Sequence, residues 1–162
     1  MILNSGRLLT CCILACAPAW AAAQPAATLA FADDLSVTAR EARSRRVPIM
    51  LVFTEASCHH CSRAKRDHLV PLQASRDYGR KVIVREIDVK RGDRLVDFAG
   101  VQTTPSAFAR RYEVRLVPTV IVVDHTGRRM GEAIVGLLIQ DFYQLYLEQA
   151  IDLARTRIAA AN

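Results

Sequence analysis

The sequence predicts one α/β domain built as a three-layer sandwich, a mixed central sheet with helices on both faces. Two apolar runs of strand length, Ile49–Phe53 and Thr119–Val123, are typical of strands covered on both sides. Helical patterns alternate with the first strands, which favours a parallel pair there. The 162 residues, 51% hydrophobic and 23% charged, suit one globular domain and exclude a disordered or fibrous chain.

The first half of the domain is expected to form a helix, a strand, a second helix and a second strand. Their expected ranges are 34–45, 49–53, 58–74 and 81–88. Asp33 or Asp34 can cap the first helix, because an aspartate side chain accepts bonds from the free N–H groups of a helix start. The second helix should bury one face, formed by Ala64, His68 and Leu72. Pro71 should kink or end that helix.

The second half is expected to form a helix, a strand pair and a last helix. Their expected ranges are 105–113, 119–123, 129–135 and 139–158, after an irregular stretch at 90–103. Thr104 as N-cap and Pro105 at the first helical position start the short helix. Gly127 can supply the positive φ of a hairpin loop at 124–127. The last helix has an apolar stripe formed by Ile139, Tyr143, Leu147, Ala150, Ala154 and Ile158.

The first 23 residues are expected to be a secretory signal peptide. They carry one charge, Arg7, then the apolar stretch Leu8–Ala17 and small residues up to Ala23. The mature protein would be residues 24–162, a single domain in the bacterial periplasm. Two alternatives stay open: a buried N-terminal helix, or a lipoprotein anchored at Cys16, because the three residues before this cysteine loosely match a lipobox.

Two cysteines, Cys58 and Cys61, remain of five once the leader is removed. A domain of this size does not need a disulfide to hold it together, so a C-x-x-C pair between a strand and a helix start indicates redox chemistry. The helix N-terminus favours a thiolate at Cys58, which would attack protein disulfides, and Cys61 would resolve the mixed disulfide. An imidazolium at His59 or His60 would stabilise the thiolate and tune the potential.

Metal and nucleic-acid binding are not expected. Four neighbouring ligands in Cys58-His59-His60-Cys61 cannot close a tetrahedron around one ion, so no metal or other cofactor is predicted. The net charge is +6, but aromatic residues make up only 6%, whereas nucleic-acid binding favours a basic stripe with interleaved aromatics. A preference for acidic partner surfaces stays possible.

The strand, the C-x-x-C at a helix start and the segment Leu116-Val117-Pro118-Thr119 resemble the thioredoxin superfamily, over about residues 34–158. The chain is more narrowly similar to the exported thioredoxin-like proteins associated with bacterial sulfur-oxidation clusters. The stretches that carry this likeness are Phe53–Cys61, Leu95–Gly100, Ala107–Pro118 and Asp124–Gly127.

The resemblance implies a thioredoxin-like fold and an exported, monomeric thiol–disulfide oxidoreductase with a membrane or periplasmic redox partner. It also implies that Pro118 follows a cis peptide and that Val117 pairs with an extended substrate. The alternative is a thioredoxin-fold metal-binding protein, such as a copper chaperone, that uses the two cysteines and a histidine.

Three departures from the family pattern leave the direction of electron flow open. Ser57 replaces a tryptophan, and His59-His60 replace Gly-Pro. Val52 stands where thioredoxins carry the buried acid that helps to deprotonate the resolving cysteine. Glu55 is the nearest carboxylate that could substitute for it.

Overall fold

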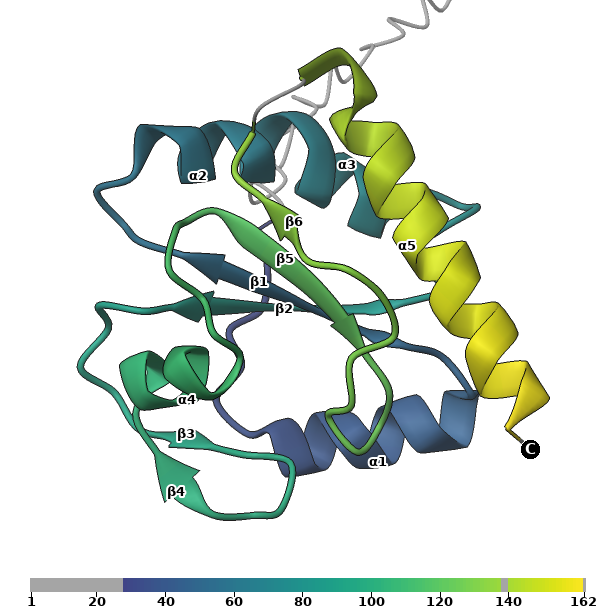
Figure 1. Cartoon of the computed structure of the whole chain (residues 1–162), viewed down its shortest axis with the longest axis horizontal. Helices are drawn as coiled ribbons and strands as arrows, with labels where there is room; N and C mark the ends of the chain where they lie inside the picture. The colour runs from purple at the N-terminus through teal and green to yellow at the C-terminus, as the bar shows by residue number, and fades with distance from the viewer. Residues whose placement is uncertain (1–27, 138–139, 162) are drawn as a thin grey trace, which may run out of the picture.

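The computed structural model describes residues 28–137 and 140–161 (Figure 1). The expected signal peptide at 1–23, the alternative lipid anchor at Cys16 and the expected start of the last helix at Ile139 lie outside the described residues. Among the described helices, none combines the length and the apolarity that a membrane crossing requires.

A four-stranded mixed sheet forms the centre of the domain, in the order β2-β1-β5-β6 (Figure 1). Its strands are β1 (Ile49–Thr54), β2 (Ile83–Asp88), β5 (Thr119–Val123) and β6 (Ile134–Val135). Strand β1 runs parallel to β2 and antiparallel to β5, which is itself antiparallel to β6. All six residues of β1 and all five of β5 are buried, as the continuous apolar runs predicted.

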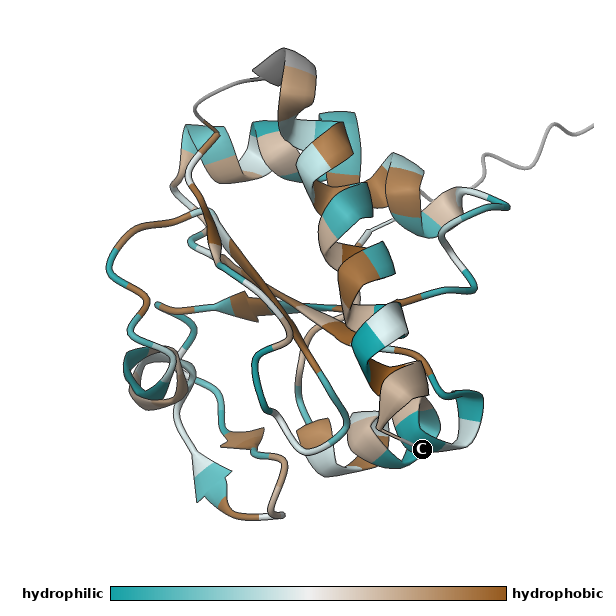
Figure 2. Cartoon of the chain, turned by 45° about the vertical axis from the view of Figure 1, so that its right-hand side comes forward, coloured by the Kyte–Doolittle hydropathy of each residue, from teal (hydrophilic) through white to brown (hydrophobic). Residues whose placement is uncertain are grey.

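Helices cover both faces of the sheet, which confirms the predicted three-layer architecture. They are α1 (Leu35–Arg45), α2 (His59–Ala64), α3 (Val70–Ala74), α4 (Pro105–Arg111) and α5 (Gln140–Ala160). Because side chains alternate along β1, Met50 and Val52 pack with residues of α2, α3 and α5, whereas Leu51 and Phe53 pack with residues of α1 and α4. Hydrophobic residues accordingly gather in the sheet and alternate with hydrophilic ones along α5 (Figure 2).

The predicted helix 58–74 contains a π-helical turn at Lys65–Leu69, between α2 and α3. The N–H of Val70 donates to the carbonyl of Lys65, five residues back. This wider turn moves the buried position from the expected His68, which is half-buried, to Leu69, which is fully buried. Pro71 is the second residue of α3, directly after the π-helical turn, and the helix continues past it to Ala74 instead of ending there.

Several sequence-based boundaries differ from the structure: α4 ends at Arg111 rather than 113, α5 ends at Ala160 rather than 158, and three strand regions also differ. The stretch 90–103, expected to be irregular, contains a small antiparallel hairpin of β3 (Leu95–Val96) and β4 (Gln102–Thr103). The strand expected at 129–135 pairs regularly only at Ile134–Val135, because after the bridge between Val123 and Arg129 the chain leaves the ladder. Strand β2 begins at Ile83 rather than 81, since the N–H of Lys81 closes a turn onto the carbonyl of Tyr78.

Candidate active site

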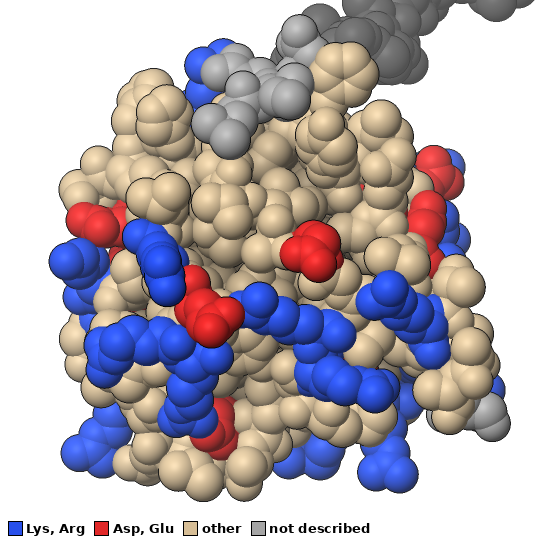
Figure 3. Space-filling view, in the orientation of Figure 1, with Lys and Arg blue, Asp and Glu red and all other residues tan. Residues whose placement is uncertain are grey.

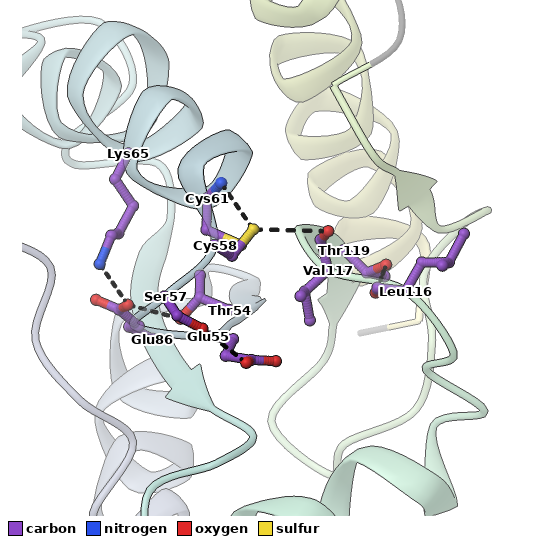
Figure 4. The surroundings of a disulfide bond; sticks show 10 residues. All are labelled: Thr54, Glu55, Ser57, Cys58, Cys61, Lys65, Glu86, Leu116, Val117 and Thr119. Atoms are coloured by element: carbon purple, nitrogen blue, oxygen red, sulfur yellow. Dashed lines mark hydrogen bonds and ion pairs between the residues drawn. A yellow bond between two sulfur atoms is a disulfide. The ribbon is translucent and has the colours of Figure 1, made fainter.

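Cys58 and Cys61 form a disulfide at the start of α2, just after the loop that follows β1 (Figure 4). A turn ends with the N–H of Cys58 donating to the carbonyl of Glu55 at 3.0 Å. Cys58 is the N-cap of α2, one residue before the first helical position at which the sequence placed it, and its Sγ accepts the N–H of Cys61 at 3.1 Å. The sulfur therefore occupies the place that a capping oxygen takes in other helices, at the positive end of the helix dipole.

The two sulfurs differ in access. Cys58 is half-buried, whereas Cys61 is fully buried, with an exposed fraction of 0%. An incoming disulfide can therefore approach Cys58 and not Cys61. This asymmetry is what sequential attack and resolution require.

A loop before β5 faces Cys58 from the opposite side (Figure 4). The peptide between Val117 and Pro118 is cis, as the resemblance implied, and the carbonyl oxygen of Val117 lies 3.9 Å from Cys58 Sγ. The loop is fixed at both ends: Thr119 donates its hydroxyl to the carbonyl of Leu116 at 2.7 Å, and the carbonyl of Pro118 accepts the N–H of Gly136 at 2.7 Å.

His59 and His60 occupy the first turn of α2, and both are exposed. Their rings stand edge to face with centroids 5.9 Å apart. Neither imidazole forms a hydrogen bond or an ion pair with a residue in the described part of the chain. Their effect on Cys58 stays a prediction.

A buried carboxylate that the sequence reasoning did not single out lies close to the disulfide (Figure 4). Glu86 is 5% exposed, and its Oε1 accepts the Thr54 hydroxyl at 2.6 Å and pairs with the Lys65 ammonium at 2.7 Å. Lys65 follows Cys61 by four residues and so shares its side of the helix. The sequence offered little signal for it, because Glu86 stands between Arg85 and Ile87 in a strand that also ends on the charged Asp88. The expected substitute, Glu55, stays in the loop and accepts the Ser57 hydroxyl at 2.8 Å.

The described residues contain no group of three or more His, Cys, Asp or Glu side chains placed to hold one metal ion. The four neighbouring ligands of the C-H-H-C segment therefore do not converge on a common point. The two sulfurs are bonded to each other instead.

Comparison with known proteins agrees with this geometry. The sequence model of a thioredoxin-like domain matches residues 35–151, and no curated protein sequence matches the chain. Similar solved structures include a thioredoxin-fold protein from Helicobacter pylori, at 20% identity and a TM-score of 0.53, covering 70% of this chain and 81% of that one. Oxidised thioredoxin O2 from Arabidopsis thaliana is 18% identical with a TM-score of 0.53, covering 80% and 99%. Oxidised mitochondrial thioredoxin 3 from Saccharomyces cerevisiae is 18% identical with a TM-score of 0.51, covering 76% and 93%.

Proposed function

Because this chain belongs to the family of thioredoxin-like domains, we propose that it is a thiol–disulfide oxidoreductase that exchanges electrons with protein thiols and disulfides. One observation carries the proposal. The half-buried Cys58 caps α2, is bonded to the fully buried Cys61 and lies 3.9 Å from the carbonyl of Val117.

The reaction follows from this arrangement. In the reduced protein, the Cys58 thiolate attacks one sulfur of a partner disulfide, forms a mixed disulfide and releases the partner's other sulfur as a thiolate. Cys61 then loses its proton and attacks Cys58 Sγ, which releases the partner's second thiol and restores the Cys58–Cys61 disulfide. Two electrons pass to the partner, and the reverse sequence oxidises a partner dithiol. The N–H of Cys61 and the dipole of α2 stabilise negative charge on Cys58 in either direction.

Val117 and Pro118 would hold the partner chain during this exchange. The segment before β5 is held by the bond from Thr119 to Leu116 and by the bond from Gly136 to Pro118, so Val117 can offer its backbone to an extended strand of the partner. A partner cysteine paired there would be presented directly to Cys58. Pro118 is buried and has no backbone N–H, so it cannot donate a hydrogen bond to the partner strand.

Glu86 and Lys65 would assist the second step. Cys61 is buried, so the proton that it loses needs a nearby acceptor. The carboxylate of Glu86 is held by Thr54 and by Lys65, which follows Cys61 by one helical turn. Removing the charge of Glu86 should therefore slow resolution of the mixed disulfide more than its formation.

We also propose that the protein works outside the cytoplasm. The leader at 1–23 and the narrower likeness to exported thioredoxin-like proteins of sulfur-oxidation clusters support this location. The intact mass of protein recovered from the periplasm of an expressing bacterium tests it. Loss of the leader agrees with export, an added acyl mass on Cys16 indicates a lipoprotein, and a full-length mass contradicts both.

Reduction of insulin tests the enzymatic proposal. Residues 24–162 with dithiothreitol as electron donor should accelerate insulin precipitation, and Cys58→Ser should abolish the acceleration. Ser44→Ala, an exposed change in α1, is the matched control and should keep full activity. A protein that leaves insulin intact but retains one copper ion per chain through purification would instead support the metal-binding alternative.

A further inference from the structure

A groove beside the disulfide shares Val117 with the candidate active site. One wall is the segment 114–117, another is α4, and the third is the chain that follows β2. Val89, Ala109 and Val114 give the groove apolar walls. A partner segment that pairs with Val117 would therefore extend its neighbouring side chains into this groove.

Three basic side chains surround the groove, namely Lys90, Arg110 and Arg115. All three are exposed, and none has an acidic partner among the described residues. One carboxylate, that of Glu55, also lines the groove and accepts a hydroxyl from Ser57 at 2.8 Å. The groove therefore has an excess of positive charge that the protein itself does not neutralise.

Three other basic side chains of the domain, by contrast, are paired with acids. Arg111, next to Arg110, donates to Asp97 at 2.6 Å, and Arg128 donates to Asp124 at 3.1 Å. Lys65 pairs with the buried Glu86. Figure 3 shows lysine and arginine gathered in a band across the lower half of one face, with few acidic side chains among them. The three cations at the groove are thus free to meet charge from outside.

We propose that this groove selects partner proteins that carry a carboxylate side chain close to the reactive cysteine. This inference rests on the proposed exchange reaction and names the substrate class of the same site. The apolar walls would hold the aliphatic part of a glutamate or aspartate, and Arg110, Arg115 and Lys90 would bind its charge. A guanidinium can bind a carboxylate through two parallel hydrogen bonds, which favours a carboxylate over other polar groups.

Disulfide-linked peptide homodimers test the inference in a single turnover. Three peptides differ only at the residues two positions before and after a single cysteine, which are both Glu, both Gln or both Lys. Protein 24–162 is reduced with dithiothreitol, freed of it, and mixed with each homodimer; Cys58 and Cys61 become a disulfide as the homodimer becomes two peptide thiols. Each rate is divided by the rate of the same peptide with dithiothreitol, which removes the effect of its charge on the disulfide itself.

The Glu peptide should react about tenfold faster than the Lys peptide at low ionic strength, with the Gln peptide between them, because up to three exposed ion pairs contribute. The ratio should shrink toward one in 1 M salt, which screens such pairs. In Arg110→Glu/Arg115→Glu, the ratio should fall below two or invert. The matched control Arg76→Glu/Arg155→Glu changes two exposed arginines away from the groove by the same charge and should keep the wild-type ratio.

The outcomes separate the two proposals. Equal normalised rates for the three peptides, with exchange itself intact, overturn the groove and leave the oxidoreductase standing. An equal loss of preference in both double variants also overturns it, since net charge would then explain the effect. A wild-type protein that reacts with none of the homodimers overturns both proposals.

Discussion

Val52 and Glu86 are register partners in the parallel strands β1 and β2. Val52 occupies the position, six residues before Cys58, at which the family resemblance places a buried acid. The side chains of register partners in a sheet share one face, so Glu86 brings its carboxylate to the same face from the neighbouring strand. A buried carboxylate therefore lies on the strand next to the position where the resemblance expects one, on the same face of the sheet.

Glu86→Gln should destabilise the protein and alter its pH–rate profile. Lys65 would lose its partner at 2.7 Å in a largely buried setting, which we expect to cost about 2 kcal/mol. Urea unfolding measures the cost, and the pH dependence of insulin reduction reports the loss of the proton acceptor. Glu41→Gln removes an exposed partner of Arg45 and Arg85 and should cost less than about 1 kcal/mol. Equal costs, with identical pH profiles, would contradict the role of Glu86.

Cys61→Ser should trap a mixed disulfide through Cys58. Cys58 is half-buried and accessible, and the serine cannot complete the second attack. Mass spectrometry after incubation with a disulfide-containing protein should show one covalent partner per chain. Cys58→Ser should trap little, because Cys61 is fully buried. Equal trapping by the two variants would reverse the assignment of the nucleophile.

The potential of the disulfide should lie between that of thioredoxin, roughly −270 mV, and that of the strong periplasmic oxidant, roughly −120 mV. A positive charge on an imidazole next to Cys58 would stabilise the thiolate of the reduced form, but both rings are exposed, so screening would reduce such an effect. Replacing His59-His60 by Gly-Pro should lower the potential by about 30 mV or more, which is about 1.4 kcal/mol for two electrons. Equilibration with glutathione measures it. An unchanged potential would mean that the histidines do not tune this site.

Gly127→Ala should destabilise the protein more than Gly100→Ala. Both glycines have a positive φ, +86° and +82°, which costs a side chain about 1–2 kcal/mol. A Cβ at Gly127 would also lie 2.6 Å from the ring of Phe98 and 2.9 Å from the Tyr112 hydroxyl, whereas a Cβ at Gly100 would meet nothing within 4 Å. The contacts should add about 2 kcal/mol. The urea midpoints of the two variants measure the difference. Similar midpoints would show that the loop around Gly127 can shift to relieve the contacts with Phe98 and Tyr112.

Asp97→Asn should weaken the fall in the free energy of unfolding at acid pH. The Arg111 guanidinium, helped by the backbone N–H groups of Val101 and Ala99, lowers the pKa of Asp97 below its usual 3.8. A lowered pKa adds stability that is complete above about pH 5 and is lost as pH falls through the folded value. The difference in unfolding free energy between wild type and variant should therefore close below pH 4. A difference that stays constant from pH 7 to the acid limit would contradict this.

Local patterns in the sequence predicted most of the fold. Apolar runs placed β1 and β5, Asp34 caps α1 as expected, and Thr104 and Pro105 begin α4. The β3–β4 hairpin was not predicted because two residues are too few to show the alternating pattern of a strand. The π-helical turn was missed because its only sign is a spacing of five between the buried Ala64 and Leu69.

The site was predictable where it is local in sequence and not where it is assembled across strands. Cys58 and Cys61 are three residues apart, and their relation to the helix start could be inferred from the chain itself. Glu86 follows Cys61 by 25 positions, and only the register between β1 and β2 brings it beneath α2. The groove cations Lys90 and Arg115 likewise come from separate loops and look like ordinary surface charges in the sequence.

The fold depends on the number of residues in the π-helical turn at Lys65–Leu69 as well as on their identity. It holds one residue more than an α-helical turn needs, and that residue sets the angular phase of α2 relative to α3. Removing it would rotate one half by about 100° against the other. Cys61 could then face the sheet only if Leu69 and Leu72 left the core that they share with Tyr143. Insertions and deletions should therefore be tolerated far less in this turn than point substitutions.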